Sequence, residues 1–471
     1  MSTEEQKQEV EVTIDDQKYS ALEGSLLIDL LIKHKLKVPY FCYHEALGAD
    51  GNCRMCMVQI EGQKRPQIAC DTPISRGMNI YTKGEMIERV RLDILELELI
   101  NHPVDCPICD QAGECKLQDY YMDYGLYESN IKKSDKVHHQ KHIDLGSEVM
   151  LDQERCVLCA RCTRFTSDIT KTHELGIIGR GDDARVSTMP GKKLDNPYAM
   201  NVVDLCPVGA LTSKDFRFAQ RVWFLQETPS ICQGCAKGCN IFIDHNREKY
   251  KDEKIYRFRP RRNDAVNGHF MCDAGRLSYK ELQEHRELLT SVDSSEVNKE
   301  EAIEATCKLI EANSDIVVLA DANFYTEELE AIEHYAHTIG AKLLAPLDSY
   351  RDEAFADAWL KSSMRASNAK AVEKLGIATE LPSGEVTLLI NFNHPDANTI
   401  QAKNRVDIRT HLDPKSSALV VLPLAVSTES SGSLINEDAK EQYTQKVIQR
   451  NEPIPTVAEW IAYLKGGETC H

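Results

Sequence analysis

The sequence predicts an α+β chain of several domains, in which small cysteine-bearing domains precede a C-terminal α/β domain. The chain has 471 residues, which is more than one domain usually holds. Fifteen of its 17 cysteines lie between Cys42 and Cys272. After Leu288, short apolar runs rich in β-branched residues alternate with helical patterns, which is typical of a parallel sheet covered by helices.

The composition excludes some classes of function. The formal net charge of -18 would repel the phosphates of nucleic acid, so no nucleic-acid partner is expected. No uninterrupted apolar run is long enough to cross a bilayer, and the segment MSTEEQKQEV shows no leader pattern. We therefore expect no membrane span, and a reducing compartment in which clustered cysteines bind metal.

The first domain is expected over residues 1–83, as a [2Fe–2S] ferredoxin-like fold of the β-grasp type. VEVTI (10–14) alternates apolar and polar residues, and DDQ turns the chain toward KYSAL, which predicts a β-hairpin. SLLIDLLIKHKL follows at helical period, with Ser25 as the expected N-cap. A cysteine-bearing loop comes next.

This loop carries the first set, which is Cys42, Cys53, Cys56 and Cys70. A C-x2-C pair with two flanking cysteines is similar to the plant-type [2Fe–2S] loop, although that loop has C-x4-C where this one has C-x10-C. Gly51 suits a backbone that wraps closely around sulfide. The spacing predicts one [2Fe–2S] cluster.

A helical segment is expected over residues 84–146. Its helix, EMIERVRLDILELELI, should bury the apolar residues Met86, Val90, Ile94 and Leu97 and end near a C-cap at Asn101. The second set follows this helix and consists of His102, Cys106, Cys109 and Cys115. A cubane cluster needs four ligands, so three cysteines need a partner. His102 could instead be an ordinary histidine at the negative end of the helix, but the cysteine count favours its role as the fourth ligand of a [4Fe–4S] cluster.

Two further sets follow. The domain expected over residues 147–224 holds the third set, Cys156, Cys159, Cys162 and Cys206, whose C-x2-C-x2-C run and distant Cys–Pro are typical of one [4Fe–4S] ferredoxin cluster. The domain expected over residues 225–285 holds the fourth set, Cys232, Cys235, Cys239 and Cys272, in which Gly234 and Gly238 permit tight turns. Zinc is the alternative for every set, because tetrahedral cysteine sites are common. Cys307 is expected in a core, and Cys470 lies in the tail.

An α/β domain is expected over residues 286–471. IVVLA (316–320), VTLLINF (386–392) and ALVVL (418–422) read as strands, EELEAIEHYAHTIG as a helix, and ESSGSLINEDAKEQ as a polar loop. The chain shows no Gly-rich dinucleotide or phosphate loop after a strand and no catalytic triad or zinc-protease motif. Four metal sets without substrate chemistry predict a carrier of single electrons.

The quoted motifs now allow a comparison with a known family. FCYH, GNCRMC, NHPVDCPICDQAGECKLQD, RCVLCARCTRF and DLCPVGALTSKDFRFAQRVWFLQETPSIC resemble the large iron–sulfur subunit of respiratory complex I, NADH:quinone oxidoreductase, over residues 1 to about 285. The resemblance implies the same four ligand sets, His102 included, and the fourth set looks like the extra [4Fe–4S] site of some bacterial members. ALVVLPLAVSTESSGSLINEDAKEQ is similar to a segment of the molybdopterin-oxidoreductase fold, which implies a shortened domain of that type without a molybdenum cofactor.

The resemblance also implies a function and partners. Electrons would come from a flavin- and NADH-binding subunit and leave through other iron–sulfur subunits toward quinone. The chain would belong to the peripheral arm of a membrane complex, on the cytoplasmic side of the bacterial inner membrane. Two alternatives remain, namely the equivalent subunit of an NAD-linked hydrogenase or formate dehydrogenase, and a zinc-stabilised interaction scaffold.

Overall fold

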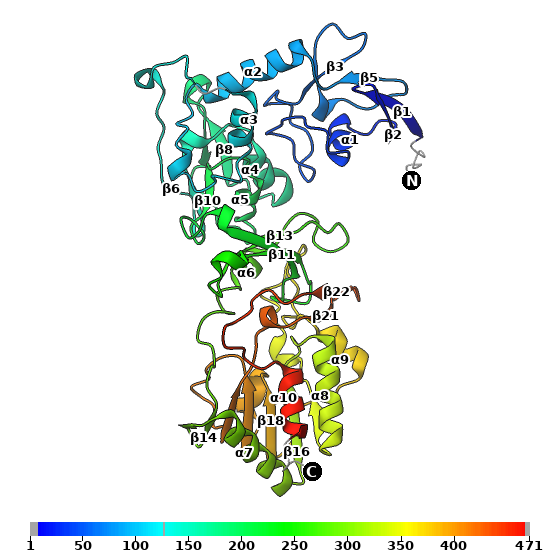
Figure 1. Ribbon diagram of the computed structural model, residues 1–471, viewed down its shortest axis with the longest axis vertical. Helices are drawn as coiled ribbons and strands as arrows, with labels where there is room; N and C mark the ends of the chain where they lie inside the picture. Colours follow the sequence, from blue (N-terminus) through cyan, green and yellow to red (C-terminus); the bar gives the residue numbers. More distant parts are fainter. Residues whose placement is uncertain (1–7, 126–127, 467–471) are drawn as a thin grey trace. The chain divides into compact units, whose positions relative to one another are not determined.

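The computed structural model describes residues 8–125 and 128–466 (Figure 1). It divides into two compact units, residues 1–223 and residues 224–471. Each unit mixes α-helices with β-strands and has its own sheets and hydrophobic core. Among the described residues, no helix is both long enough and apolar enough to cross a membrane.

The first unit begins with a five-stranded mixed sheet in the order β2-β1-β5-β3-β4. Its strands are β1 (Glu9–Ile14), β2 (Gln17–Leu22), β3 (Met57–Ile60), β4 (Gln67–Ile68) and β5 (Asn79–Tyr81). β1 and β2 form the expected hairpin, and Asp15 and Asp16 turn the chain between them with φ of 46° and 66°. Two successive positive φ angles are typical of the type I′ turn, whose twist matches a hairpin.

Helix α1 (Leu27–Lys33) packs its apolar face against this sheet. The prediction that Ser25 caps the helix is wrong. Leu26 occupies the N-cap position, and the Ser25 hydroxyl donates to the carbonyl of Leu22 at 2.6 Å. Short polar side chains often form hydrogen bonds with the nearby backbone. Because the Ser25 hydroxyl binds the turn after β2, it does not cap the helix.

Helix α2 (Glu85–Leu99) has the expected bounds, but the prediction of its buried face is wrong. Arg91 and Leu95 are buried, whereas Met86 is 49% exposed and Leu97 is 67% exposed. Two residues of the predicted apolar stripe therefore face outward, whereas Val90 and Ile94 are half-buried. An apolar period locates a helix, but it does not identify which side of the helix meets the protein when the opposite side also carries apolar residues.

The buried face of α2 is organised around Arg91. Its Nη1 donates to the carbonyl of Thr82 at 3.0 Å, and its Nη2 donates to the carbonyl of Met57 at 2.6 Å. The guanidinium thus binds the ends of two sheet strands. Asn101 does not cap α2 as predicted, since Ile100 is the C-cap residue, and the Asn101 side chain accepts the N–H of Val137 at 3.0 Å.

The remainder of the first unit consists of short elements. Its helices are α3 (Lys116–Tyr124), α4 (Arg161–Arg164) and α5 (Asn201–Leu205), and its strands are β6 (Ile143–Asp144), β7 (Val149–Leu151), β8 (Leu175–Ile178), β9 (Arg185–Thr188) and β10 (Leu211–Ser213). β10, β7 and β6 form an antiparallel sheet, and β8 pairs with β9. Loops and helix ends therefore position the cysteines. Cys162 lies within α4, and Cys206 directly follows α5.

The second unit starts with a three-stranded antiparallel sheet and a short helix. These elements are β11 (Leu225–Ile231), β12 (Asn240–Asn246), β13 (Ile255–Pro260) and α6 (Asp273–Leu277). The loop from β11 to β12 carries three cysteines of the fourth set, and Cys272 is the N-cap residue of α6. Ile241, Ile243, Phe258 and Met271 form the core between these elements.

The C-terminal part contains the expected parallel sheet, in the order β15-β14-β20-β19-β18-β16-β17. Its strands are β14 (Ser291–Val292), β15 (Ser295–Glu296), β16 (Ile316–Ala320), β17 (Lys342–Leu344), β18 (Val386–Phe392), β19 (Ala402–Arg409) and β20 (Val420–Pro423). The five strands from β16 to β20 run parallel to their neighbours. The hairpin of β14 and β15 adds an antiparallel edge that the sequence did not predict.

Helices cover one face of this sheet (Figure 1). They are α7 (Lys299–Ala312), α8 (Thr326–Thr338), α9 (Ala369–Leu375) and α10 (Val457–Gly466). Alternate residues of β16, such as Val318, pack under them, while Val317 and Leu319 belong to a second core on the other face. Cys307 is fully buried in the helical core as expected, and Cys470 lies outside the described residues.

The prediction that ESSGSLINEDAKEQ forms a polar loop is wrong. It contains β21 (Gly432–Ile435) and the first two residues of β22 (Glu441–Thr444), and the two strands form an antiparallel hairpin. All four residues of β21 are buried, and the backbone N–H of Ser433 donates to the Glu327 carboxylate at 2.8 Å. The polar composition is misleading here, because neighbouring side chains satisfy the strand's polar groups inside the unit.

Candidate metal centres

The first set lies at one end of the five-stranded sheet. Cys42 and Cys53 belong to the long loop after α1, Cys56 directly precedes β3, and Cys70 lies in a short 3-10 helix, Ala69–Asp71. All four are buried. The structure therefore brings together every residue that the spacing predicts for a [2Fe–2S] cluster.

The thiols of this set hydrogen-bond to one another and to the backbone. The N–H groups of Phe41 and Cys42 lie 3.4 and 3.5 Å from Cys53 Sγ. A hydrogen bond with Cys53 lowers the pKa of Cys42, and one with Cys70 lowers the pKa of Cys56. The arrangement thus favours thiolates at two positions, and backbone N–H groups that point at sulfur are among the contacts that tune an iron–sulfur cluster.

The second set gathers around one cavity. His102, Cys106, Cys109 and Cys115 line it together with Gly209. A Cβ atom on Gly209 would lie 2.3 Å from Cys109 Sγ, so only glycine fits there. Gly209 had no predicted role, although the Cys-Pro-x-Gly spacing after the last cysteine of the third set marks it in the sequence.

His102 has the properties of a neutral nitrogen ligand. Burial lowers the pKa of His102 to about 4, so its imidazole is uncharged at neutral pH, as metal binding requires. The Val104 N–H donates to Nδ1 at 3.0 Å. The Lys136 ammonium donates to the carbonyls of Leu99 and His102 at 3.1 and 2.7 Å. These contacts position the loop that carries His102, and no spacing or motif in the sequence marks Lys136 for this role.

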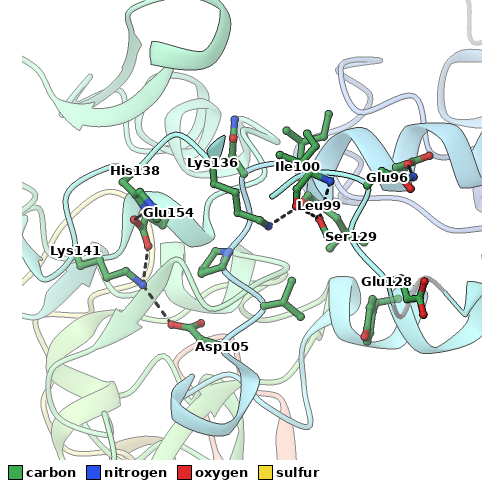
Figure 2. A pocket seen from close by; sticks show the side chains of 16 residues that line it. Glu96, Leu99, Ile100, Asp105, Glu128, Ser129, Lys136, His138, Lys141 and Glu154 are labelled. Atoms are coloured by element: carbon green, nitrogen blue, oxygen red, sulfur yellow. Dashed lines mark hydrogen bonds and ion pairs between the residues drawn. The ribbon is translucent and has the colours of Figure 1, made fainter. Parts of the chain in front are cut away.

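A cavity of about 590 Å³ lies beside this set (Figure 2). One wall carries paired charges. Lys141 Nζ lies 3.3 Å from Asp105 and 2.8 Å from Glu154, and His138 Nδ1 lies 2.7 Å from Glu154. The Lys141 ammonium thus holds Asp105, which directly precedes Cys106, against the segment of Glu154.

The third set lines another cavity. Its members are Cys156, Cys159, Cys162 and Cys206, and the thiol of Cys156 accepts the N–H of Leu158 at 3.4 Å. Leu158 has φ of 47°, a strained conformation for a non-glycine residue, and it lets the short C-x2-C-x2-C run curve around the cavity. Burial raises the pKa of Cys159 to about 12, so this thiolate needs a positive group or a metal.

Arg161 lies within the same cysteine run and has no predicted role. It is 4% exposed, and its guanidinium donates to the carbonyls of Leu205, at 3.0 Å, and of Tyr43. Its Nε has no hydrogen-bond partner among the described residues. A buried cation held by neutral carbonyls is unfavourable unless an anionic group lies nearby. A cluster bound by four thiolates would supply that negative charge, so the surroundings of the third set fit one.

The fourth set lies in the second unit and lines a further cavity with three glycines. Gly234 N–H lies 3.4 Å from Cys232 Sγ, and Gly275 N–H lies 3.3 Å from Cys272 Sγ. A Cβ atom on Gly275 would approach Cys232 Sγ to 3.0 Å. Gly238 has φ of +63°, as the expected tight turn requires. The backbone can therefore approach the sulfurs closely, as a cluster site needs.

Two segments far along the chain cover this fourth set. The hairpin of β21 and β22 binds the loop of Cys235 and Cys239, because the Gln442 amide donates to the Gly238 carbonyl at 2.9 Å and the Glu437 N–H donates to the Ala236 carbonyl at 2.8 Å. Arg365 Nε donates to the Gly234 carbonyl at 2.7 Å. The loop that carries Cys235 and Cys239 is thus held both by the β21–β22 hairpin and by Arg365.

Four regions of the chain match known families. They are a 2Fe-2S iron–sulfur cluster binding domain over residues 7–85, an NADH-ubiquinone oxidoreductase-G iron–sulfur binding region over residues 91–130, the ferredoxin-like domain of NADH-quinone oxidoreductase subunit 3 over residues 146–212, and the molybdopterin oxidoreductase Fe4S4 domain over residues 225–284. Each matched region contains one complete ligand set.

Individual proteins are similar over part of their length. The G subunit of NADH-quinone oxidoreductase from Rickettsia bellii is 38% identical over 277 residues, which are 59% of this chain and 40% of the relative. The NADH-ubiquinone oxidoreductase 78 kDa subunit of Neurospora crassa is 39% identical over 285 residues, 60% of this chain and 38% of the relative. Among solved structures, a chain of an NAD+-reducing [NiFe]-hydrogenase is 29% identical with a TM-score of 0.41, and the match covers 45% of this chain and 91% of that one.

The chain spans about two fifths of the length of the curated relatives that it matches. The four matched families lie in the part of the chain that carries the cysteine sets. This chain is similar to the large iron–sulfur subunit of NADH-quinone oxidoreductase over about three fifths of its length.

Proposed function

We propose that this chain carries single electrons through iron–sulfur clusters within an NADH:quinone oxidoreductase. The first set would hold a [2Fe–2S] cluster, and the second, third and fourth sets would each hold a [4Fe–4S] cluster. The observation that carries the proposal is that each set, although drawn from separate segments, is gathered at one place.

Such clusters accept and release one electron without breaking a covalent bond. The chain's own residues would bury the sulfurs, direct N–H groups at them and place charge beside them. Gly234 and Gly275 do so in the fourth set, and Arg161 does so beside the third. Hydrogen bonding, burial and nearby charge are the means by which a protein tunes a cluster.

The partners follow from the family. A flavin- and NADH-binding subunit would deliver electrons, and other iron–sulfur subunits would take them toward quinone. The chain would lie in the peripheral arm of the membrane complex, on the cytoplasmic side of the bacterial inner membrane. Its C-terminal α/β part would serve as a shortened molybdopterin-oxidoreductase scaffold without molybdenum.

The test is a native purification in mild detergent, with analysis of iron, sulfide and every co-purifying chain. Four clusters require about 14 iron atoms per chain, given the cluster types that the ligand spacing implies. Co-purifying membrane subunits and NADH-to-quinone electron transfer would support the proposal. A detergent-independent complex with hydrogenase or formate dehydrogenase chains would overturn the assignment to this complex and keep the electron-carrying role.

A zinc scaffold predicts a different outcome. The ligands of zinc must all lie about 2.0–2.3 Å from a single ion, whereas those of a cluster surround several iron atoms. A colourless protein that contains zinc and no labile sulfide would overturn the electron-transfer proposal entirely.

A further inference from the structure

We propose that Arg161 and Arg164, together with Asn52, form a positively charged link that fixes the first set to the third and stabilises an electron on either cluster. The inference rests on the proposed function, because it requires clusters at both sets. The three residues are positioning residues, since they act through the cysteine loops. An electron moves between the clusters with no bond made or broken.

Arg164 binds the loop that carries the first cysteine of the first set. Its Nη2 donates to the carbonyl of Cys42, and its Nη1 donates to the carbonyls of Leu47 and Gly48 at 3.0 and 3.3 Å. Asp50 lies 3.8 Å away as the charge partner. Because a planar guanidinium presents several donors in a fixed fork, one side chain can gather carbonyls that a lysine could not.

Arg161 lies one helical turn from Arg164 and reaches both sets. It donates to the carbonyl of Tyr43, which directly follows Cys42, and to the carbonyl of Leu205, which directly precedes Cys206. One buried guanidinium is therefore bonded to the backbone next to a ligand of each set. Any change in the distance between the two cysteine loops would break one of these bonds.

Asn52 makes the third contact. It directly precedes Cys53 of the first set, and its Nδ2 donates to the carbonyl of Leu158 at 2.8 Å. Leu158 lies between Cys156 and Cys159 of the third set, and its φ of 47° sets the direction of this part of the cysteine run. The strained residue of the third set is thus tied directly to the loop of the first.

The positive charge of Arg161 has an effect of its own, in addition to the hydrogen bonds that fix the two loops. A guanidinium stays protonated throughout the physiological pH range, so its charge does not depend on proton uptake. The Arg161 guanidinium is buried among neutral carbonyls, where a charge acts over a longer distance than in water. It should therefore stabilise the reduced, more negative form of both clusters and raise both midpoint potentials.

The experiment is a redox titration of the full chain, monitored by electron paramagnetic resonance after the iron content has been measured. Arg161→Gln with full iron should lower the midpoint potentials of the first and third clusters and leave the other two unchanged. Arg161→Lys keeps the charge, so the midpoint potentials should stay the same. A lysine cannot donate to two carbonyls in the geometry of a guanidinium, so the magnetic interaction between the two clusters should weaken. Arg89→Gln is the control, because that arginine lies on α2 with 70% of its side chain exposed.

The outcomes separate this inference from the proposed function. A wild-type chain without iron and sulfide overturns the proposed function, and the link with it. Unchanged potentials in a fully loaded Arg161→Gln protein, or a shift confined to one cluster, overturn the link alone. If Arg161→Gln loses iron, the fully loaded Arg161→Lys protein decides, because potentials that fall in spite of the retained charge, or an unchanged magnetic interaction, overturn the link.

Discussion

Arg155 Nε and Nη2 lie 3.0 and 2.8 Å from the two carboxylate oxygens of Asp105. Arg155 directly precedes Cys156 of the third set, and Asp105 directly precedes Cys106 of the second. A bidentate ion pair therefore joins the two segments next to a ligand of each. Such fork-to-carboxylate pairs fix orientation as well as distance, so this pair defines how the second and third sets lie relative to one another.

Replacing Arg155 by Met should destabilise the first unit. Arg155 has 5% of its side chain exposed, and it also lies 3.3 Å from Asp152, so its loss leaves buried carboxylates short of a cation. We expect the free energy of unfolding to fall by about 3 kcal/mol, the usual cost of breaking a buried pair from one side. Thermal unfolding followed by circular dichroism would measure it.

The control for this variant is Arg185→Met. Arg185 pairs with the exposed Asp183 at 2.6 Å, and exposed pairs contribute at most about 1 kcal/mol. Equal losses of stability in the two variants would show that the Arg155 pair has no special role.

The stability of the second unit should depend on the protonation of Glu328. Burial raises the pKa of Glu328 from 4.5 to about 7. Between these values the folded chain keeps a proton that the unfolded chain has released, so stability should fall as the pH rises from about 4.5 to about 7 and then level off. Glu328→Gln removes the charge and keeps an acceptor for the Tyr325 N–H, which now lies 3.0 Å from the carboxylate.

This variant should therefore be more stable than the wild type at pH 8, by about 3 kcal/mol, and the difference should shrink toward pH 5. Thermal unfolding across this range would measure it. Glu330→Gln is the control, because Glu330 is exposed on the same helix. An equal gain in both variants at pH 8 would mean that the general negative charge of the chain, and not burial of Glu328, is responsible.

The sequence predicted the parts of the molecule that depend on neighbours along the chain. The runs of closely spaced cysteines in each set are visible in the sequence, because a loop that wraps a cluster returns several ligands at short intervals, whereas Cys206 and Cys272 come from distant segments. The hairpin at Asp15 and Asp16 follows from turn chemistry. β16 and β18 follow from apolar runs of strand length.

The parts that failed depend on residues far apart in the sequence. The buried face of α2 is decided by Arg91, whose acceptors belong to Thr82 and Met57. Arg161 reads as an ordinary surface charge until the carbonyls of Tyr43 and Leu205 are seen around it. No periodicity or spacing rule connects residues over such separations, so only the folded chain shows them.

Gly209→Ala should remove the second cluster, which Cys109 would bind, and leave the other clusters in place. The added Cβ would lie 2.3 Å from Cys109 Sγ, so either the backbone or the cysteine must move. We expect the iron content to fall by about four atoms per chain, since one [4Fe–4S] cluster holds four. Iron analysis and the spectrum of the remaining clusters would test this.

Gly384→Ala is the matched control for the glycine change. A Cβ at Gly384 would have no atom of the described residues within 4 Å, so this variant should keep all its iron. Retention of every cluster in Gly209→Ala would mean that the loop relaxes around the methyl group, and that close packing against Cys109 is not required.

His102→Cys should keep the second cluster and lower its midpoint potential. The His102 imidazole is neutral, because burial lowers its pKa to about 4, whereas a cysteine ligand binds as a thiolate. The exchange adds a negative charge at the cluster, which stabilises the oxidised form. A redox titration of the two proteins at equal iron content would measure the shift. His334→Cys, at an exposed position of α8 in the second unit, should leave every potential unchanged. An unchanged or higher potential in His102→Cys would show that His102 does not bind the second cluster.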